Sequence, residues 1–302
     1  MKRLPQIALL PDGKRLHLQD GPIDLVIEAK GRDGDVRAAY DAAALRFTGL
    51  LDELCEELVE LRSAADPVRC TLKGVVARRM HAAVAPFAAD HFITPMAAVA
   101  GSVAEEILGS MLAAAPLDRA YVNNGGDIAL HLAGSEQFTV GLLDRPDQPG
   151  LMQTTMIDAD DVARGVATSG RHGRSFSLGI ADAVTVLART AAQADAAATI
   201  IANAVDLPGH PAIVRCPANE LQPDSDLGAR LVTRDVGALG ESEIDDAMRA
   251  GVSRAQQLLA AGLIEGAALR LLGEAAVVGA TGIKAGALPA FHEGALERTA
   301  HV

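Results

Sequence analysis

The sequence predicts an α+β protein of two layers, in which long helices cover mostly antiparallel sheets. Short apolar runs come in pairs separated by turns, and long helical patterns stand between these pairs. No Pro/Ser-rich linker and no block of charge divides the 302 residues. We therefore expect one domain over residues 1–280, followed by a flexible tail, 281–302, that mixes Gly, Ala and Pro with charge.

The first half of the chain combines one strand with three helical stretches. Alternating apolar and polar residues predict a strand over 22–30. Leucines at three- and four-residue intervals predict one long helix over 35–65, with Cys55 in the core. Two more helices are expected over 75–89 and 96–115, and the second of these has almost no charge in its first half.

The second half begins with the strongest turn signal of the sequence. An Asn-Gly pair between two apolar runs predicts a hairpin over 120–132. The remaining elements are expected as strands over 138–142, 154–157, 183–188, 212–216, 230–233 and 275–278, a surface loop over 145–150, and helices over 191–205 and 241–261. Runs of strands are therefore interleaved with long helices in this half, which favours the α+β class.

Composition narrows the classes of partner. Hydrophobic residues make up 49% and aromatic residues 3%, so the core must be aliphatic. Lys and Arg number 27 and Asp and Glu 39, and the net charge of 27 − 39 = −12 disfavours nucleic acid and anionic membranes as partners. Three scattered cysteines, no signal-peptide pattern and no uninterrupted apolar run of about 18 residues predict a cytoplasmic protein without a membrane span.

Two glycine-bearing segments could contact a ligand. In Asn123-Asn124-Gly125-Gly126-Asp127, glycines either form only a tight turn or let backbone N–H groups approach a ligand, with Asp127 at its edge. A second segment gathers hydroxyl, guanidinium and imidazole groups in one loop. It contains Thr168, Ser169, Gly170, Arg171, His172 and Arg174. Such groups bind phosphate or pyrophosphate, although a solvated basic turn would have the same composition.

Carboxylates in the next segments could hold a metal ion or require a partner. Asp195 and Thr199 stand four residues apart on the alanine-rich helix and so share one face, where their oxygens could bind Mg²⁺. A solvent-facing pair is the alternative. Asp182 enters an apolar strand and needs a partner there. No Walker loop, G-x-G-x-x-G, H-E-x-x-H or Ser-His-Asp ordering supports a nucleotide-binding or hydrolase class.

Taken in order, these segments resemble the ApbE-like family, the FAD:protein FMN transferases. That family typically has a G-G-D hairpin, then A-T-S-G, then A-D-A-x-x-T. The corresponding residues here are Gly125-Gly126-Asp127, Ala167-Thr168-Ser169-Gly170, and Ala194-Asp195-Ala196 with Thr199. The match in order and spacing covers about residues 95–205.

The resemblance implies a fold, ligands and a reaction. The fold would be a duplicated T-fold, with long helices behind antiparallel sheets. Asp195 and Thr199 would contribute to a Mg²⁺ site, and the diphosphate of FAD, or a related FMN ligand, would lie near Thr168, Ser169 and Gly170. The FMN moiety would pass to a Thr or Ser hydroxyl of an acceptor protein. T-fold proteins commonly oligomerise, so a homo-oligomer is also expected.

Two departures from the family pattern leave a second function open. The segment H-I-x-D-P-x-T-G that follows T-S-G in the transferases is missing, and Ala98-Val99-Ala100-Gly101 stands where the family has G-x-x-K-G. The sequence thus looks most like a shorter branch of the superfamily whose function is unknown. The alternative to Mg²⁺-dependent flavinyl or phosphoryl transfer is a non-catalytic protein that binds a purine, pterin or flavin, or assembles with a partner enzyme.

Overall fold

The computed structural model describes residues 4–145, 148–279 and 283–284, except for the side chains of 142–153 and 283–284. Within these residues the central feature is a nine-stranded, fully antiparallel sheet. In spatial order its strands are β1 (Gln6–Leu9), β2 (Leu16–Asp20), β3 (Ile23–Lys30), β4 (Arg119–Asn124), β5 (Asp127–Leu132), β8 (Gly165–Ser169), β9 (Ala183–Ala188), β12 (Gly266–Leu271) and β13 (Glu274–Gly279).

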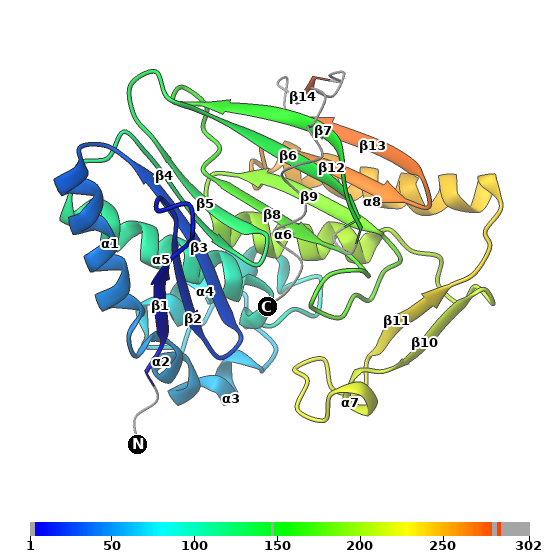
Figure 1. Ribbon diagram of the computed structural model, residues 1–302. Helices are drawn as coiled ribbons and strands as arrows, with labels where there is room; N and C mark the ends of the chain where they lie inside the picture. The colour runs from blue at the N-terminus through cyan, green and yellow to red at the C-terminus, as the bar shows by residue number, and fades with distance from the viewer. Residues whose placement is uncertain (1–3, 146–147, 280–282, 285–302) are drawn as a thin grey trace.

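Helices cover one side of this sheet (Figure 1). They are α1 (Asp33–Phe47), α2 (Leu50–Glu56), α3 (Leu58–Leu61), α4 (Val75–Val84), α5 (Val99–Ala114), α6 (Ala191–Ala204) and α8 (Glu241–Ala260), with 3₁₀ turns η1 (Ala85–Phe87) and η2 (Pro95–Ala98). α5 packs on β4 and β5, α6 on β8 and β9, and α8 on β12 and β13. The predicted α+β class with helices behind an antiparallel sheet is confirmed.

Two small hairpins complete the described structure. β6 (Gln137–Arg145) and β7 (Gln148–Asp158) pair with each other, and β14 (Ile283–Lys284) joins β7. β6 and β7 lie against the sheet face opposite the helices, where Val140 and Ile157 meet Leu130 and Leu187. β10 (Ile213–Pro217) and β11 (Leu231–Val236) form an arm with α7 (Ala218–Leu221) that projects from the main body (Figure 1).

The same order of elements occurs twice along the sheet. A hairpin, a helical segment and a second hairpin give β2-β3-β4-β5, and the same order gives β8-β9-β12-β13, except that the β10–α7–β11 arm is inserted between α6 and α8. The two halves join through a short β5–β8 pairing, Ile128 with Val166 and Ala129 with Gly165. This repeat agrees with a duplicated unit, while its identification as a T-fold stays a prediction.

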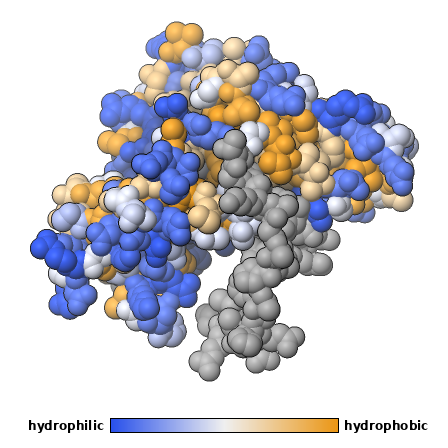
Figure 2. Space-filling view, turned by 90° about the horizontal axis from the view of Figure 1, so that it is seen from above, coloured by the Kyte–Doolittle hydropathy of each residue, from blue (hydrophilic) through white to orange (hydrophobic). Residues whose placement is uncertain are grey.

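The cores are mostly aliphatic, as the composition predicts, with Phe47 and Phe87 as buried aromatic residues. One cluster lies beneath β2–β5 and includes Leu25, Ile27 and Phe47, and another lies beneath β8–β13 and includes Val184, Ile201 and Leu269. The face seen from above carries hydrophobic and hydrophilic side chains side by side (Figure 2). The large apolar side chains are therefore gathered mainly between the helices and the sheet.

The apolar stretch Pro95–Ala114 is long enough to cross a membrane, with a mean hydropathy of 1.3 and 44% of the window buried. In this structure α5 packs between α1 and α6 and against β4 and β5. Its side chains Val103, Ile107 and Met111 are fully buried. Such packing is typical of a core helix.

The predicted long helix over 35–65 is wrong. The helical residues divide into α1, α2 and α3 because Gly49 takes a left-handed conformation, with φ 87°, and the helical path breaks again at Glu57. Cys55, expected in the core, is exposed. α2 buries Leu50 and Leu54 instead, so the residue after Leu54 faces outward.

Other boundaries also differ from the predictions. The surface loop expected over 145–150 is largely strand, because β6 runs to Arg145 and pairs there with Gln148 of β7. The strands near 212–216 and 230–233 pair only with each other. β1, β2 and β12 were not predicted. The tail 281–302, predicted to be flexible, lies outside the described residues except for Ile283–Lys284.

Two glycines let the first turn of α6 approach its neighbours closely. A Cβ on Gly101 of α5 would lie 2.3 Å from the carbonyl oxygen of Ala191. A Cβ on Gly165 of β8 would lie 2.1 Å from the carbonyl carbon of Thr190. Any side chain at either position would collide with backbone, so α6 sits between α5 and β8 at backbone distance.

We predict opposite effects for two glycine-to-alanine changes on α5. Gly101→Ala should lower the free energy of unfolding by about 1–3 kcal/mol, because the new Cβ must displace backbone. Gly109→Ala should raise it by about 0.5–1 kcal/mol, because no atom lies within 4 Å of its Cβ position and alanine restricts the unfolded chain. Urea titrations of both variants measure the difference. An equal gain in stability for both would contradict the close approach.

Candidate functional site

The G-G-D turn and the T-S-G segment meet where the two halves of the sheet join. β4 and β5 turn through Gly125 and Gly126, and Asn123 Oδ1 accepts a hydrogen bond of 2.8 Å from the Gly126 N–H. The β5–β8 pairing stops at Ile128 and Val166, which leaves the next N–H of β8 without a strand partner. The structure thus places together two segments that are about forty residues apart in the sequence.

Asp127 fills the gap that opens between β5 and β8. Its Oδ1 accepts the N–H of Thr168 at 3.2 Å. Along β5, Asp127 shares a face with Ala129, which packs in the helix-side core, so its carboxylate lies on the helix side of the sheet. Burial raises the pKa of Asp127 to about 7, although the hydrogen bond from Thr168 acts to lower it.

Asp195 approaches the same place from α6. Its Oδ2 accepts the N–H of Gly101 at 3.0 Å, in the first turn of α5. Burial, and then the negative charge of Asp127, raise the pKa of Asp195 well above its usual value, against the hydrogen bonds from Gly101 and Ala100. The two carboxylates therefore repel each other, and the positive end of α5 offsets this only in part.

Three neighbouring groups complete the helix-side wall. Asn124 Nδ2 donates to the carbonyl oxygen of Ala100 at 3.1 Å and fixes the turn to the start of α5. Ser169 shares the helix-facing side of β8 with the buried Ala167. Thr199 lies one turn beyond Asp195 on α6 and is half-buried. Ser169 of β8 thus faces the helix layer, and Thr199 lies on the same side of α6 as Asp195.

Thr168 contributes through its backbone more than through its side chain. Its hydroxyl shares a 2.9 Å hydrogen bond with Thr185 Oγ1 of β9. Its side chain lies on the same sheet face as Val166, which packs beneath the β6–β7 hairpin. The N–H that reaches Asp127 is therefore the part of Thr168 that faces the two carboxylates.

Asp182 forms hydrogen bonds with two of the side chains predicted to bind phosphate, Arg171 and His172. Its Oδ1 accepts Arg171 Nε at 2.9 Å and lies 3.2 Å from His172 Nε2. The Leu272 N–H donates to its Oδ2 at 2.6 Å. Asp182 is 4% exposed, so these contacts supply the partners that its position in an apolar strand requires.

Arg174 is placed differently from Arg171 and His172. It is exposed and lies over the G-G-D turn, where a Cβ on Gly125 would be 3.4 Å from Arg174 Nη1. Among the described residues no hydrogen bond or ion pair engages its guanidinium. Of the three basic residues in this loop, Arg174 is the one whose charge remains available to a ligand.

The donor set suits a hard cation more than a soft one. Within the described residues no group of three or more His, Cys, Asp and Glu side chains gathers as a metal site. Asp127, Asp195 and Thr199 offer only oxygen, which Mg²⁺ prefers, and their two carboxylates lack a basic partner. Oxygen donors with uncompensated negative charge fit Mg²⁺, with phosphate oxygens or water as its remaining ligands.

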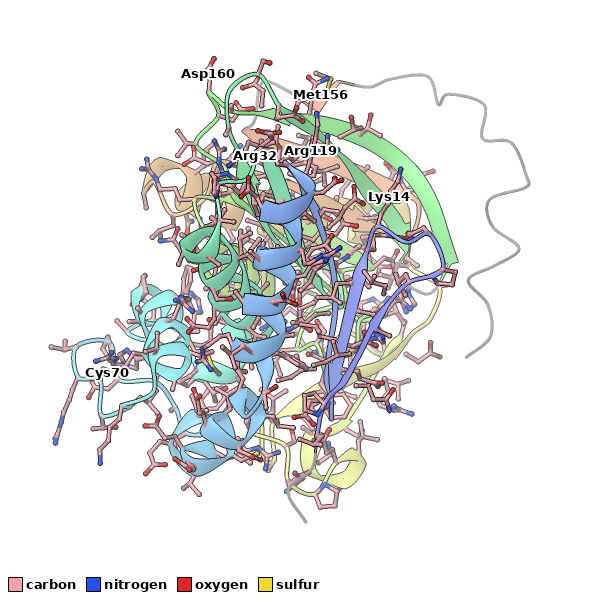
Figure 3. All side chains as sticks on the ribbon, turned by 60° about the vertical axis from the view of Figure 1, so that its left-hand side comes forward. Lys14, Arg32, Cys70, Arg119, Met156 and Asp160 are labelled. Atoms are coloured by element: carbon pink, nitrogen blue, oxygen red, sulfur yellow. The ribbon has the colours of Figure 1, made fainter. Side chains whose placement is uncertain are left out.

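Sequence reasoning missed the part played by the start of α5. Ala100 and Gly101 supply the N–H groups that reach Asp195, and Asn124 ties the turn to them. A glycine within an otherwise alanine-rich helix start was the available signal, since it indicates close packing. Cys70, one of the three scattered cysteines, lies on an exposed loop away from the sheet and is not part of the candidate site (Figure 3).

Several known proteins are similar to this chain. UPF0280 protein MK0206 of Methanopyrus kandleri is 41% identical over 182 residues, which cover 60% of this chain and 69% of that protein. UPF0280 proteins of Archaeoglobus fulgidus and Methanothrix thermoacetophila are 36% and 37% identical, over 46% and 37% of this chain. The chain spans about half the length of these last two, 54% and 46%.

A solved structure and a family model also match. The apo form of Pseudomonas stutzeri flavinyl transferase ApbE aligns over 91% of this chain and 94% of that chain, with a TM-score of 0.47 and 11% identity. The family model described as "AbpE bacteria" matches residues 7–277. This match covers almost the whole described chain and includes every residue of the candidate site. The protein is therefore ApbE-like and belongs to the bacterial AbpE family.

Proposed function

We propose that this protein binds a flavin nucleotide, FAD or FMN, or a related phosphorylated heterocycle, together with Mg²⁺. The observation that carries the proposal is the meeting of Asp127 and Asp195 at the first turn of α5. Two half-buried carboxylates without a basic partner favour a cation between them. The motif order from Gly125 to Thr199, which resembles the FAD:protein FMN transferases, supports the choice of ligand.

Asp195 and Thr199 would hold the cation, with Asp127 beside it. The N–H groups of Gly101 and Ala100 fix the orientation of the Asp195 carboxylate, whose oxygens have further lone pairs for the cation. Bound Mg²⁺ would neutralise the charge of a diphosphate and of its leaving group. The chain itself contributes the rigid placement of these oxygens by α5, α6 and β5.

The loop after β8 would hold the phosphates. Arg174 beside the Gly125-Gly126 turn supplies the available positive charge, and Thr168, Ser169 and Gly170 form the edge of the site. Arg171 and His172 would support the loop through Asp182, which already accepts their N–H groups. In this arrangement their contribution to phosphate binding is electrostatic and at longer range.

The reaction class to test is flavinyl transfer. A Ser or Thr hydroxyl oxygen of an acceptor protein would bond to the phosphorus of the FMN moiety of FAD, and the bond to the AMP phosphate would break. The hydroxyl proton needs a base. Burial raises the pKa of Asp127 to about 7 in the metal-free protein, and a cation beside it would lower that pKa, so Asp127 would serve as the base only if Asp195 and Thr199 held the cation without it.

Binding without transfer is the second candidate. It is favoured by the absence of the H-I-x-D-P-x-T-G segment and by the engagement of Arg171 and His172 with Asp182. Transfer would leave flavin covalently attached to a second protein after denaturation, whereas binding alone would release it. Fluorescence of denaturing gels after incubation with FAD, Mg²⁺ and a cell extract separates the two.

The homo-oligomer and the cytoplasmic location stay predictions.

We predict a Mg²⁺-dependent thermal shift with FAD. At a hundredfold excess of ligand over its Kd, mass action should raise the Tm by about 4 °C, because the ligand binds only the folded state. Asp195→Asn should abolish the Mg²⁺-dependent part, since it removes one of the two charges that hold the cation. Differential scanning fluorimetry with FAD, FMN, GTP and a reduced pterin, each with and without Mg²⁺, measures the effect.

The control for this experiment is Asp245→Asn, which removes one carboxylate charge from the exposed side of α8. It should keep the full shift. A shift that persists in Asp195→Asn, or that appears only with a pterin and without Mg²⁺, would refute the cation site.

We also predict a pH dependence of stability in the absence of metal. Because the pKa of Asp127 is raised from 3.8 to about 7 on folding, the folded state holds this proton more tightly than the unfolded state. Its contribution is present below about pH 4 and is lost as the pH rises to about 7. Asp195, the charged group that faces Asp127, changes stability in the same direction.

Asp127→Asn should therefore reduce the fall in Tm between pH 4 and 7, and Mg²⁺ should stabilise the wild type more at pH 8 than at pH 5, since it competes with protons for the same oxygens. Thermal melts across this range, with Asp245→Asn as the matched control, test both statements. An unchanged pH profile in Asp127→Asn would contradict them.

A further inference from the structure

The N-terminal ends of α5 and α6 cap each other, each through a carboxylate from the second turn of the other helix. The Gly101 N–H of α5 donates to Asp195 of α6 at 3.0 Å. In the reverse direction, the Ala192 N–H of α6 donates to Glu105 Oε1 of α5 at 2.8 Å. Each helix thus supplies the carboxylate that satisfies an N-terminal N–H of the other.

The two hydrogen bonds lie side by side in one contact between the helices, because the residues that form them are spaced by about one turn on each helix. Glu105 follows Gly101 by four residues on α5, and Asp195 follows Ala192 by three on α6, so each pair lies on one helix face. The backbone contact of Gly101 with Ala191 lies at the same place. A rotation or slide of α6 that broke one hydrogen bond would strain the other.

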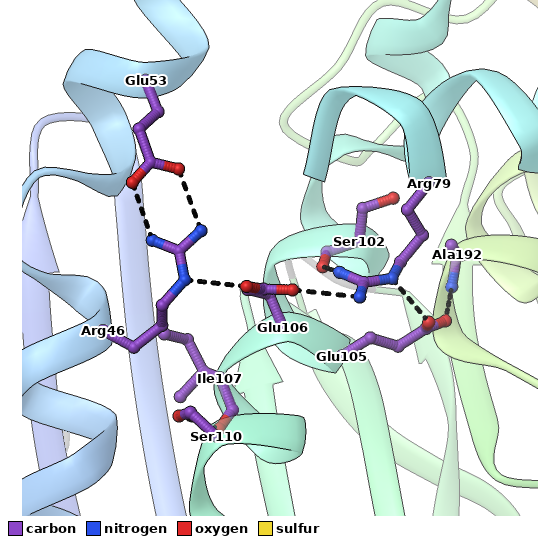
Figure 4. A network of polar contacts seen from close by, with 9 residues as sticks. All are labelled: Arg46, Glu53, Arg79, Ser102, Glu105, Glu106, Ile107, Ser110 and Ala192. Atoms are coloured by element: carbon purple, nitrogen blue, oxygen red, sulfur yellow. Dashed lines mark hydrogen bonds and ion pairs between the residues drawn. The ribbon is translucent and has the colours of Figure 1, made fainter. Parts of the chain in front are cut away.

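Glu105 is itself held in place from its far side (Figure 4). Its Oε2 pairs with Arg79 Nε of α4 at 3.2 Å, and Arg79 Nη2 pairs with Glu106 at 3.0 Å. Arg46 of α1 joins Glu106 at 2.7 Å and binds Glu53 through two further hydrogen bonds. The Glu105 side chain is 20% exposed, so this ionic chain fixes its orientation in a partly dehydrated setting.

We infer that Glu105 is a positioning residue for the proposed cation site: its hydrogen bond to the start of α6 sets where the Asp195 carboxylate stands relative to Asp127. The effect of Glu105 on metal binding rests on the proposed function. The effect of Glu105 on the Gly101–Asp195 contact does not, because it follows from the two hydrogen bonds alone.

Glu106 provides a matched control within the same network. It lies next to Glu105, carries the same charge and binds Arg79 as Glu105 does. Its second partner is Arg46, and no described contact joins its side chain to α6. Removing either glutamate disturbs the ionic chain, but only removal of Glu105 releases the α6 N–H.

The first test is hydrogen exchange of the Gly101 amide in metal-free protein, followed by NMR with ¹⁵N-glycine. In Glu105→Ala we expect this amide to exchange about tenfold faster than in Glu106→Ala. Glu105→Gln should restore protection, because its amide oxygen can still accept the Ala192 N–H although it cannot pair as an ion with Arg79. Equal Gly101 exchange in all three variants would overturn the positioning role. If Glu105→Ala fails to fold, Glu105→Met takes its place, because it keeps the length of the side chain but cannot accept the Ala192 N–H. Gly101 exchange should then be about tenfold faster in Glu105→Met than in Glu106→Met, and equal exchange in these two variants would overturn the positioning role.

The second test is the affinity for Mg²⁺ alone, by isothermal titration calorimetry. Changes to groups that orient a metal ligand weaken binding by about 10–100-fold. We expect a loss of at least about tenfold in Glu105→Ala and less than about twofold in Glu106→Ala. Equal affinities in the two variants would refute positioning of the cation ligand. Absence of Mg²⁺ binding in the wild type would refute the proposed function instead, and the exchange experiment would then decide the structural inference by itself.

Discussion

The backbone contact between α5 and α6 is the constraint on which the rest of the candidate site depends. Gly101 and Gly165 remove the two Cβ atoms that would otherwise hold α6 away from α5 and β8. The start of α6 can then lie where the two halves of the sheet join, and it brings Asp195 to the start of β5, beside Asp127. The close packing of α6 against α5 and β8 thus connects the two halves of the sheet and brings Asp195 of one half next to Asp127 of the other.

That placement has an electrostatic consequence. Other partly buried carboxylates of the described residues have arginine partners. In the chain Arg46–Glu106–Arg79–Glu105, for example, arginines alternate with glutamates. Asp127 and Asp195 receive only N–H groups, and the pKa of both is raised. Dipoles at the start of α5 therefore stabilise the charges less than burial and repulsion destabilise them. A proton relieves this imbalance at low pH, and a cation can do so at higher pH.

Much of the fold can be predicted from local patterns in the sequence. What cannot be predicted in this way are the contacts between residues that are far apart in the sequence. The Asn-Gly hairpin, the buried strand β9 and the alanine-rich helix α6 have signals within a few residues, and all three are present. The sequence singles out Asp127 and Asp195 separately. Their meeting depends on the close approach at Gly101, where the glycine indicates close packing but does not identify α6 as the neighbour. Likewise, Asp182 was expected to need a partner, while its choice of Arg171 and His172 depends on how the loop folds back.

The two candidate functions differ in which part of the site they require. The carboxylates, the start of α5 and the Gly125-Gly126 turn are fixed by helices and strands, and none of their described contacts involves residues 175–181. The family segment missing from this chain would follow the T-S-G motif, in the part of the loop that is tied to Asp182. The rigid part could therefore hold a cation although the loop differs, and a phosphorylated ligand would in addition need Arg174, which precedes residues 175–181. Binding thus requires fewer groups than transfer, which also needs a group of this chain or of the incoming acceptor to take up the hydroxyl proton.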